Sequence, residues 1–84
     1  MTQRKLLITG ASQGIGAALV EQARAAGHQV TFTGRARARI EALAATTGAH
    51  GIVADVTSGP DNQRTVHEAM ARMGGIDTLV NNAG

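Results

Sequence analysis

The chain has no cysteine, tryptophan or tyrosine, and only one phenylalanine and one proline among its 84 residues. The lack of cysteine excludes disulfide frameworks, cysteine-ligated zinc sites and thiolate nucleophiles. The lack of aromatic side chains removes the surfaces on which nucleic-acid bases stack, so we expect no nucleic-acid partner. The core must be built from aliphatic side chains, and the length suffices for one small domain.

Long apolar runs are also missing. The segment Leu6–Ile8 after the basic N-terminus is far shorter than the apolar region of a signal peptide, and no stretch approaches the ~18 apolar residues of a membrane span. We therefore expect a cytoplasmic protein without membrane contact. The formal net charge is only +2, but Arg35, Arg37 and Arg39 stand at alternate positions, which suggests binding of a small anion such as a phosphate.

Short apolar runs alternate with stretches of helical period, which predicts parallel strands joined by crossover helices. The expected strands are Lys5–Thr9, Gln29–Thr33, Gly51–Ala54 and Thr78–Asn81, and the expected helices are Ile15–Ala26, Ala38–Thr46 and Pro60–Met73. Right-handed crossovers predict the strand order 3-2-1-4, with the first two helices on one face of the sheet and the third on the other. The chain is then half of a doubly wound, Rossmann-type α/β fold of the form βαβαβαβ.

The apolar positions of each expected helix predict the face that it buries. Because these positions recur every three or four residues, each set lies along one side of its helix and can pack on the sheet. The predicted core positions are Ile15, Ala18, Leu19, Ala23 and Ala26 in the first helix, Ile40, Leu43 and Ala44 in the second, and Val66, Met70 and Met73 in the third.

The most informative segment is Thr9–Gly16, which reads TGASQGIG and lies between the first strand and the first helix. Gly10 can turn the chain with a positive φ, Gly14 leaves the backbone bare for an anion, and Gly16 lets the helix pack closely on the strand. The N–H groups at the helix start would then point toward a pyrophosphate. The alternative interpretation is a strand-to-helix turn without a ligand.

The end of the second expected strand carries no acidic residue, although a dinucleotide site usually has one there to hold a ribose 2′-hydroxyl. The strand runs instead into Gly34 and Arg35. A guanidinium can bind a 2′-phosphate through two parallel hydrogen bonds. The pattern therefore favours NADP over NAD. The alternative is a solvated arginine at the start of a loop, and we interpret Arg37 and Arg39 as solvated helix residues.

Two further motifs follow the third and fourth expected strands, namely Asp55-Val56 and the run Asn81-Asn82-Ala83-Gly84. Together with the TGxxxGxG pattern of Thr9–Gly16, they resemble the short-chain dehydrogenase/reductase family of the classical type. The resemblance covers the whole chain and corresponds to the N-terminal, cofactor-binding part of that family. It implies an oxidoreductase that transfers hydride between a nicotinamide cofactor and a carbonyl or alcohol.

The resemblance also implies a binding role for each motif. The glycine-rich segment would line the pyrophosphate and the adenosine ribose, and Arg35 would meet the 2′-phosphate. Asp55 would accept from the adenine amino group with Val56 beside the ring, and the asparagine run would lie near the ribose on the nicotinamide side. Gln13 is neutral where family members often carry a basic residue. The implied cofactor-binding residues are Gly10, Ser12, Gln13, Gly14, Ile15, Gly16, Arg35, Asp55, Val56, Asn81, Asn82 and Ala83.

The family's catalytic residues have no counterpart in the chain. They are a serine, an asparagine in a later helix, and a tyrosine and lysine spaced Tyr-x-x-x-Lys, whereas this sequence has no tyrosine and its one lysine, Lys5, begins the first strand. The three histidines, His28, His50 and His67, lack metal-ligand spacing, so we expect no metal site. We therefore expect residues 1–84 to be a partial NAD(P)-binding domain, truncated after the fourth strand and without catalytic residues of its own.

Two alternatives to this interpretation stay open. One is an adenine-nucleotide binding module without redox chemistry. The other is an interaction protein that self-associates through the open edge of the fourth strand, because an unpaired strand edge is a template for another chain.

Overall fold

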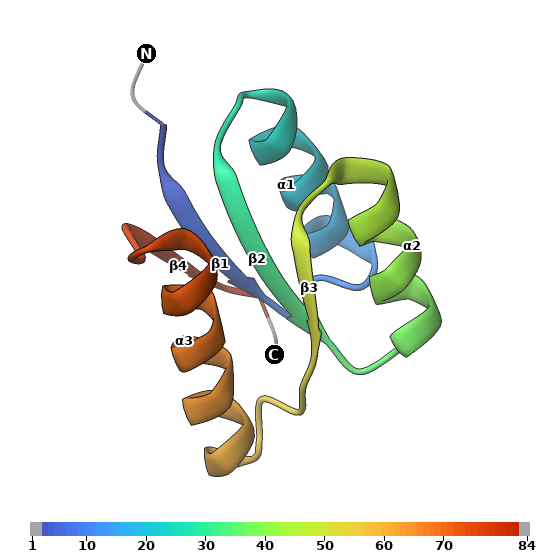
Figure 1. The fold of residues 1–84 in the computed structure, drawn as a ribbon. Helices are drawn as coiled ribbons and strands as arrows, with labels where there is room; N and C mark the ends of the chain where they lie inside the picture. The colour runs from blue at the N-terminus through green and yellow to red at the C-terminus, as the bar shows by residue number, and fades with distance from the viewer. Residues whose placement is uncertain (1–2, 83–84) are drawn as a thin grey trace.

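Strands and helices alternate along the chain in the computed structural model, which describes residues 3–82 (Figure 1). The elements are β1 (Lys5–Thr9), α1 (Gly14–Ala25), β2 (Gln29–Gly34), α2 (Arg37–Thr47), β3 (His50–Val53), α3 (Gly59–Met73) and β4 (Thr78–Asn81). Every boundary lies within one residue of the position predicted from the sequence. Among the helices of this described part, none combines the length and the apolar character that crossing a bilayer requires.

The four strands form one parallel sheet in the order β3-β2-β1-β4, as predicted. Helices α1 and α2 cover one face of this sheet and α3 covers the other (Figure 1). From β1 the chain adds β2 and β3 on one side of the sheet, and it then returns to add β4 on the other side of β1. The point where the strand order reverses therefore lies between β1 and β4. In open α/β sheets, ligands bind at such a reversal, beyond the carboxyl ends of the strands.

Neighbouring residues of β1 divide the hydrophobic core into two parts. Ile8 faces α1 and α2, where it joins a cluster around the fully buried ring of Phe32. Leu7 faces α3 and packs with Ala69 and Met73. This alternation is what a parallel strand covered on both faces requires. The two clusters hold the helix starts at fixed positions along the carboxyl edge of the sheet.

The buried face predicted for α1 is partly wrong. Ile15 is 74% exposed, and Ala18 and Ala26 are exposed as well. The helix turns Gly16 and Val20 fully into the interface with the sheet. The absent side chain at Gly16 lets the backbones approach there, and this close contact sets the rotation of the helix. The predicted positions that do pack against the core are Leu19 and Ala23.

The buried face predicted for α3 is also displaced by one position. Thr65 and Ala69 are buried together with Met73, whereas Val66 and Met70 are 48% and 47% exposed. Small side chains again face the sheet, and the larger apolar ones lie on the flank of the helix. Only Met73 of the predicted α3 stripe belongs to the core.

The α2 prediction is confirmed, since its buried and partly buried core residues are Ile40, Leu43 and Ala44.

Strand β4 forms one edge of the described sheet and pairs only with β1 there. Leu79 of β4 is aligned with Leu7 of β1, so the two side chains point to the same face, yet Leu79 is 61% exposed. Helix α3 shields Leu7 but not Leu79. Within residues 3–82, this edge carries exposed apolar surface.

Candidate functional site

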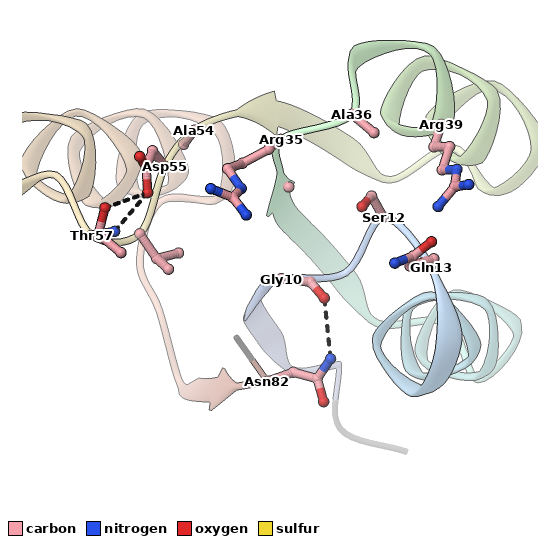
Figure 2. A pocket seen from close by; sticks show the side chains of 12 residues that line it. Gly10, Ser12, Gln13, Arg35, Ala36, Arg39, Ala54, Asp55, Thr57 and Asn82 are labelled. Carbon is pink, nitrogen blue, oxygen red and sulfur yellow. Dashed lines mark hydrogen bonds between the residues drawn. The ribbon is translucent and has the colours of Figure 1, made fainter. Parts of the chain in front are cut away.

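A cavity of about 600 Å³ opens at the carboxyl edge of the sheet, where β1, β2 and β3 lead into their helices (Figure 2). Segments far apart in the sequence meet around it because the parallel strands all end at this edge. The residues that line it are Gly10, Ser12, Gln13, Gly34, Arg35, Ala36, Arg39, Ala54, Asp55, Val56, Thr57 and Asn82.

The glycines after β1 shape one wall of the cavity. Gly10 and Gly14 have φ values of 65° and 64°, a region that favours glycine. A Cβ on Gly16 would lie 2.7 Å from Cα of Ala11 and 2.8 Å from the carbonyl oxygen of Gly10, so α1 can pack this closely on the turn only with glycine there. The turn at Gly10 and the close packing at Gly16 are confirmed.

The first turn of α1 is left open by its own sequence. Gln13 occupies the N-cap position in an extended conformation, but its side chain accepts no capping hydrogen bond, and the first turn contains no acidic residue. A Cβ placed on Gly14 would meet no atom within 4 Å. Uncapped N–H groups and the positive end of the helix dipole form an anion-binding arrangement, and the space beside Gly14 admits an anion.

One backbone hydrogen bond and one side-chain hydrogen bond fix the turn against its neighbours. The Ala11 N–H donates to the carbonyl oxygen of Thr33 (2.7 Å), and the Nδ2 of Asn82 donates to the carbonyl oxygen of Gly10 (3.1 Å). A Cβ on Gly34 would lie 2.8 Å from Cβ of Ser12. The last residue of β2 must therefore be very small to let the Ser12 turn sit beside it, a requirement that the sequence analysis missed.

Asp55 lies at the far end of the cavity from the glycine turn (Figure 2). Its Oδ1 accepts hydrogen bonds from the hydroxyl (2.7 Å) and the backbone N–H (2.9 Å) of Thr57. These two bonds, and more weakly the positive charge of Arg35, hold the pKa of Asp55 below its ordinary value. The carboxylate is thus an ionised acceptor that faces the cavity at neutral pH.

Two arginines line the cavity from the β2–α2 connection. Arg35 follows the end of β2, and Arg39 projects from the first turn of α2 (Figure 2). Arg37, between them in sequence, lies outside the lining and forms an exposed ion pair with Glu41 at 3.8 Å. The interpretation of Arg37 as a solvated helix residue agrees with this geometry. Arg39 is exposed as expected, but it also belongs to the cavity.

The two asparagines after β4 take different positions. Asn82 lines the cavity and bonds to the glycine turn, whereas Asn81 accepts at Oδ1 a hydrogen bond from the Thr9 hydroxyl (3.2 Å). Both therefore tie the end of β4 to the end of β1. The predicted residue Ala83 lies outside the described residues.

The structure brings most of the predicted site residues to one place. Seven of them line the cavity. The other predicted residues within the described part of the chain lie outside the lining, and they are Gly14, Ile15, Gly16 and Asn81. The exposed Ile15 side chain stands at the start of α1. The lining residues that the sequence analysis missed are Gly34, Ala36, Arg39, Ala54 and Thr57. All five follow or end β2 or β3, so the general rule that ligands bind beyond the carboxyl ends of the strands indicates this region, but it does not identify the individual lining residues.

The histidines lie apart from this cavity. His28 accepts at Nδ1 a hydrogen bond from the backbone N–H of Arg4 (3.0 Å), and His50 contacts Glu68 across β3 and α3 (3.0 Å). Within residues 3–82, no group of three or more histidine or acidic side chains is arranged to hold a metal ion.

The fold is that of a Rossmann-type α/β domain, and the cavity lies at the edge of the sheet where such domains bind their ligands. The model of the short chain dehydrogenase family matches residues 4–84. The chain belongs to the short-chain dehydrogenase/reductase family.

Individual relatives agree with this assignment. The chain is 39% identical to the glucose 1-dehydrogenase of Gluconobacter oxydans, over 96% of this chain and 33% of the relative. The solved structure of a 3-ketoacyl-(acyl-carrier-protein) reductase from Brucella melitensis, complexed with NADH, superposes with a TM-score of 0.93 at 32% identity, over 96% of this chain and 34% of that one. The chain thus spans about a third of the length of these relatives.

Proposed function

We propose that residues 1–84 form the cofactor-binding part of an NADP-dependent short-chain oxidoreductase. When bound, the nicotinamide would supply hydride transfer to or from a carbonyl carbon. The residues of this chain bind and orient the dinucleotide, and we assign none of them to proton transfer or to the substrate. The proposal rests on the shape and charge of the cavity at the carboxyl edge of the sheet.

The glycine turn fits the pyrophosphate. The first turn of α1 offers N–H groups that Gln13 leaves uncapped, and the space beside Gly14 is open. Ser12 adds a hydroxyl at the cavity wall. A diphosphate here would meet several donors and the helix dipole at once, with no nearby acidic side chain of α1 to repel it.

The opposite end of the cavity fits an adenine ring. The Asp55 carboxylate is held by Thr57 with Oδ2 left to accept from an exocyclic amino group, and Val56 offers an apolar side chain next to it. Because the two ends share one cavity, a single elongated ligand with a charged middle and a flat, polar-edged ring can occupy both.

Arg35 carries the choice of NADP over NAD. It lies in the lining between Asp55 and the glycine turn, where the adenosine ribose of such a ligand would be (Figure 2). Strand β2 ends in Gly34 without a carboxylate that would repel a 2′-phosphate. The observation that supports NADP rather than NAD is this guanidinium in the cavity wall, at the strand end where an acidic partner of the 2′-hydroxyl would otherwise stand.

Titration calorimetry of the 84-residue chain with ADP-ribose and with 2′-phospho-ADP-ribose tests the proposal. We expect the 2′-phosphorylated ligand to bind about tenfold more tightly, because a charge-assisted hydrogen bond contributes about 1.5 kcal/mol. Arg35→Ala should remove most of this difference while the affinity for ADP-ribose stays nearly the same. Equal affinities of the wild type for the two ligands would overturn the assignment of NADP.

A second candidate function rests on the edge of the sheet. For the 84-residue chain by itself, the exposed Leu79 and the side of β4 that is unpaired within residues 3–82 favour self-association through this edge. Sedimentation at increasing concentration distinguishes this candidate, because a monomer at every concentration would contradict it.

A further inference from the structure

One end of the cavity is formed by the connection between β3 and α3, which leaves an edge strand (Figure 1). In the sheet formed by residues 3–82, β3 pairs only with β2. The Ala54 N–H donates toward β2, to the carbonyl oxygen of Gly34 (2.9 Å). Because the backbone groups of successive residues alternate between the two sides of a strand, the Val53 carbonyl and the Asp55 N–H point to the side without a strand and need other partners.

Side chains from the first two turns of α3 supply these partners. The Asp61 carboxylate accepts from the Asp55 N–H (2.8 Å), and Nη2 of Arg64 donates to the carbonyl oxygen of Val53 (2.9 Å). Asp61 and Arg64 also approach each other to 3.6 Å. At the end of β3, helix α3 thus provides the hydrogen bonds that a neighbouring strand would otherwise make.

A third side chain of α3 holds the next part of the connection. Nδ2 of Asn62 donates to the carbonyl oxygen of Val56 (2.9 Å). The N–H of the same peptide group belongs to Thr57 and donates to Oδ1 of Asp55 (2.9 Å). Together with the bond from the Asp55 N–H, helix α3 therefore binds the peptide groups on both sides of the pair Asp55-Val56.

The three side chains act from outside the cavity. Residues 54–57 line it, whereas none of the described lining residues belongs to α3. Asp61, Asn62 and Arg64 therefore reach a ligand only through the backbone that they hold. The backbone concerned carries Asp55 and Val56, the two residues to which we assign adenine.

We propose that Asp61 and Asn62 are positioning residues that hold Asp55 and Val56 in the arrangement that binds adenine. The inference rests on the proposed function, because it concerns the adenine end of the same cavity. Without these bonds the connection can adopt other backbone conformations, and the Asp55 carboxylate loses its fixed place beside the ring. A connection that is ordered before the ligand arrives lowers the entropic cost of binding.

Two pairs of variants separate positioning from a general effect on stability. Asp61→Asn keeps an oxygen that can accept from the Asp55 N–H, whereas Asp61→Ala removes it, and both variants lose the same charge. Asn62→Ala removes the donor to Val56, whereas Gln63→Ala removes a similar amide from the next exposed position. Within residues 3–82, the side chains of α3 that bond to the connection after β3 do not include Gln63.

The experiment compares the calorimetric affinities for ADP-ribose and for inosine diphosphate ribose, in which a carbonyl oxygen replaces the adenine amino group. We expect the wild type to prefer ADP-ribose about tenfold, as one charge-assisted hydrogen bond predicts. Asp61→Ala and Asn62→Ala should each reduce this ratio about threefold or more, whereas Asp61→Asn and Gln63→Ala should keep it within about twofold. A loss of folded protein lowers both affinities equally and leaves the ratio unchanged.

The amide proton of Asp55 provides a second measurement, which needs no ligand. Because this N–H donates to a carboxylate at 2.8 Å, its nuclear magnetic resonance signal should lie downfield. Asp61→Ala should move the signal upfield, and Gln63→Ala should leave it in place.

The outcomes distinguish the inference from the proposed function. If the wild type prefers ADP-ribose and both Asp61→Ala and Asn62→Ala keep the full preference, the inference is wrong and the proposed function stands. An equal loss of preference in Gln63→Ala, or an unchanged Asp55 amide signal in Asp61→Ala, also overturns the inference. If the wild type binds neither ligand or does not discriminate between them, the proposed adenine site fails and the inference fails with it.

Discussion

Helices α1 and α3 begin at the same edge of the sheet, but the first turn of α3 is capped by side chains and the first turn of α1 is not. At the start of α3, the Ser58 hydroxyl accepts from the Asp61 N–H (3.3 Å), and the Asp61 carboxylate accepts from the Asp55 N–H (2.8 Å). Pro60 needs no acceptor for its nitrogen. At the start of α1, Gln13 makes no side-chain cap and glycines replace polar residues.

The difference separates a structural helix start from one that is free to bind a ligand. In the first turn of α3 the Asp61 N–H is capped by Ser58 and Pro60 has no N–H, and the acidic residue Asp61 also matches the helix dipole. In α1 the N–H groups of the first turn receive no side-chain cap, so water or an anion can accept their hydrogen bonds. The absence of a cap is therefore informative where the neighbouring backbone is bare glycine and the turn opens into a cavity.

The largest expected effect is the destabilisation caused by replacing Gly16 in the first turn of α1. Gly16→Val would place a Cβ 2.7 Å from Cα of Ala11, and neither backbone segment can move aside without disturbing the sheet. We expect a loss of about 3 kcal/mol or more in the free energy of unfolding, together with loss of dinucleotide binding. Urea denaturation monitored by circular dichroism measures the loss.

Gly59 in the first turn of α3 provides the matched control. A Cβ there meets no atom within 4 Å, and its φ is not in the left-handed region. Gly59→Ala should be neutral or should stabilise the fold by up to about 1 kcal/mol, because alanine restricts the unfolded chain. Comparable destabilisation by the two substitutions would contradict the close contact that we assign to Gly16.

An intermediate effect is expected from the caps. Ser58→Ala removes the hydroxyl that accepts from the Asp61 N–H and should lower the free energy of unfolding by about 1 kcal/mol. Gln13→Ala removes a side chain that makes no capping bond and should change it by less than about 0.5 kcal/mol. Thermal unfolding of the two variants side by side measures both values. A larger loss in Gln13→Ala than in Ser58→Ala would reverse the distinction between the two helix starts.

The smallest effect concerns the pH dependence at the start of α3. The pKa of Asp55 is lowered in the folded state, so the stabilisation that Thr57 provides is complete above the unfolded pKa of about 3.9 and is lost as the pH falls through the folded value. Thr57→Val removes the hydroxyl donor. Its deficit in unfolding free energy should be constant at neutral pH and should shrink below about pH 4.

Nuclear magnetic resonance of the Asp55 carboxyl carbon checks this directly, because Thr57→Val should shift its titration to higher pH. Thr46→Val serves as a control, since the Thr46 hydroxyl donates to the carbonyl oxygen of Ala42, which does not titrate. The deficit of that variant should not change with pH. A Thr57→Val deficit that persists undiminished through the acid range would contradict the assigned hydrogen bonds.

The architecture could be predicted because several local signals agree. The alternation of strand and helix patterns, the glycines Gly48 and Gly74 that end α2 and α3 with positive φ, and the right-handed crossover rule all lead to one topology. The order β3-β2-β1-β4 follows from these signals without knowledge of any side-chain contact.

The rotation of two helices could not be predicted in the same way. Counting apolar residues places Ile15 and Val66 in the core, but the structure exposes both. Close approach to the sheet selects the smallest side chains, Gly16 in α1 and Ala69 in α3, and an apolar count gives these little weight. Which side of a helix comes closest depends on the strands opposite, and those contacts are not local in sequence.

The site shows the same division. Residues within a motif, such as Gly10 and Asp55, were found because their spacing relative to a strand is fixed. The sequence analysis interpreted Arg39 as a solvated residue and did not place it in the cavity, because its position there depends on how α2 leaves the end of β2. Gly34 was missed because its role is set by Ser12, which lies far from it in sequence.

The lone ring of Phe32 gives the molecule a built-in optical probe. It is the chain's one aromatic side chain, it is fully buried, and it lies between the sheet and α2. Any near-ultraviolet dichroism of these 84 residues therefore originates from this single core position. Since there is no tryptophan or tyrosine to absorb or to exchange energy, the fluorescence of a reduced nicotinamide ring can be followed against an essentially dark background.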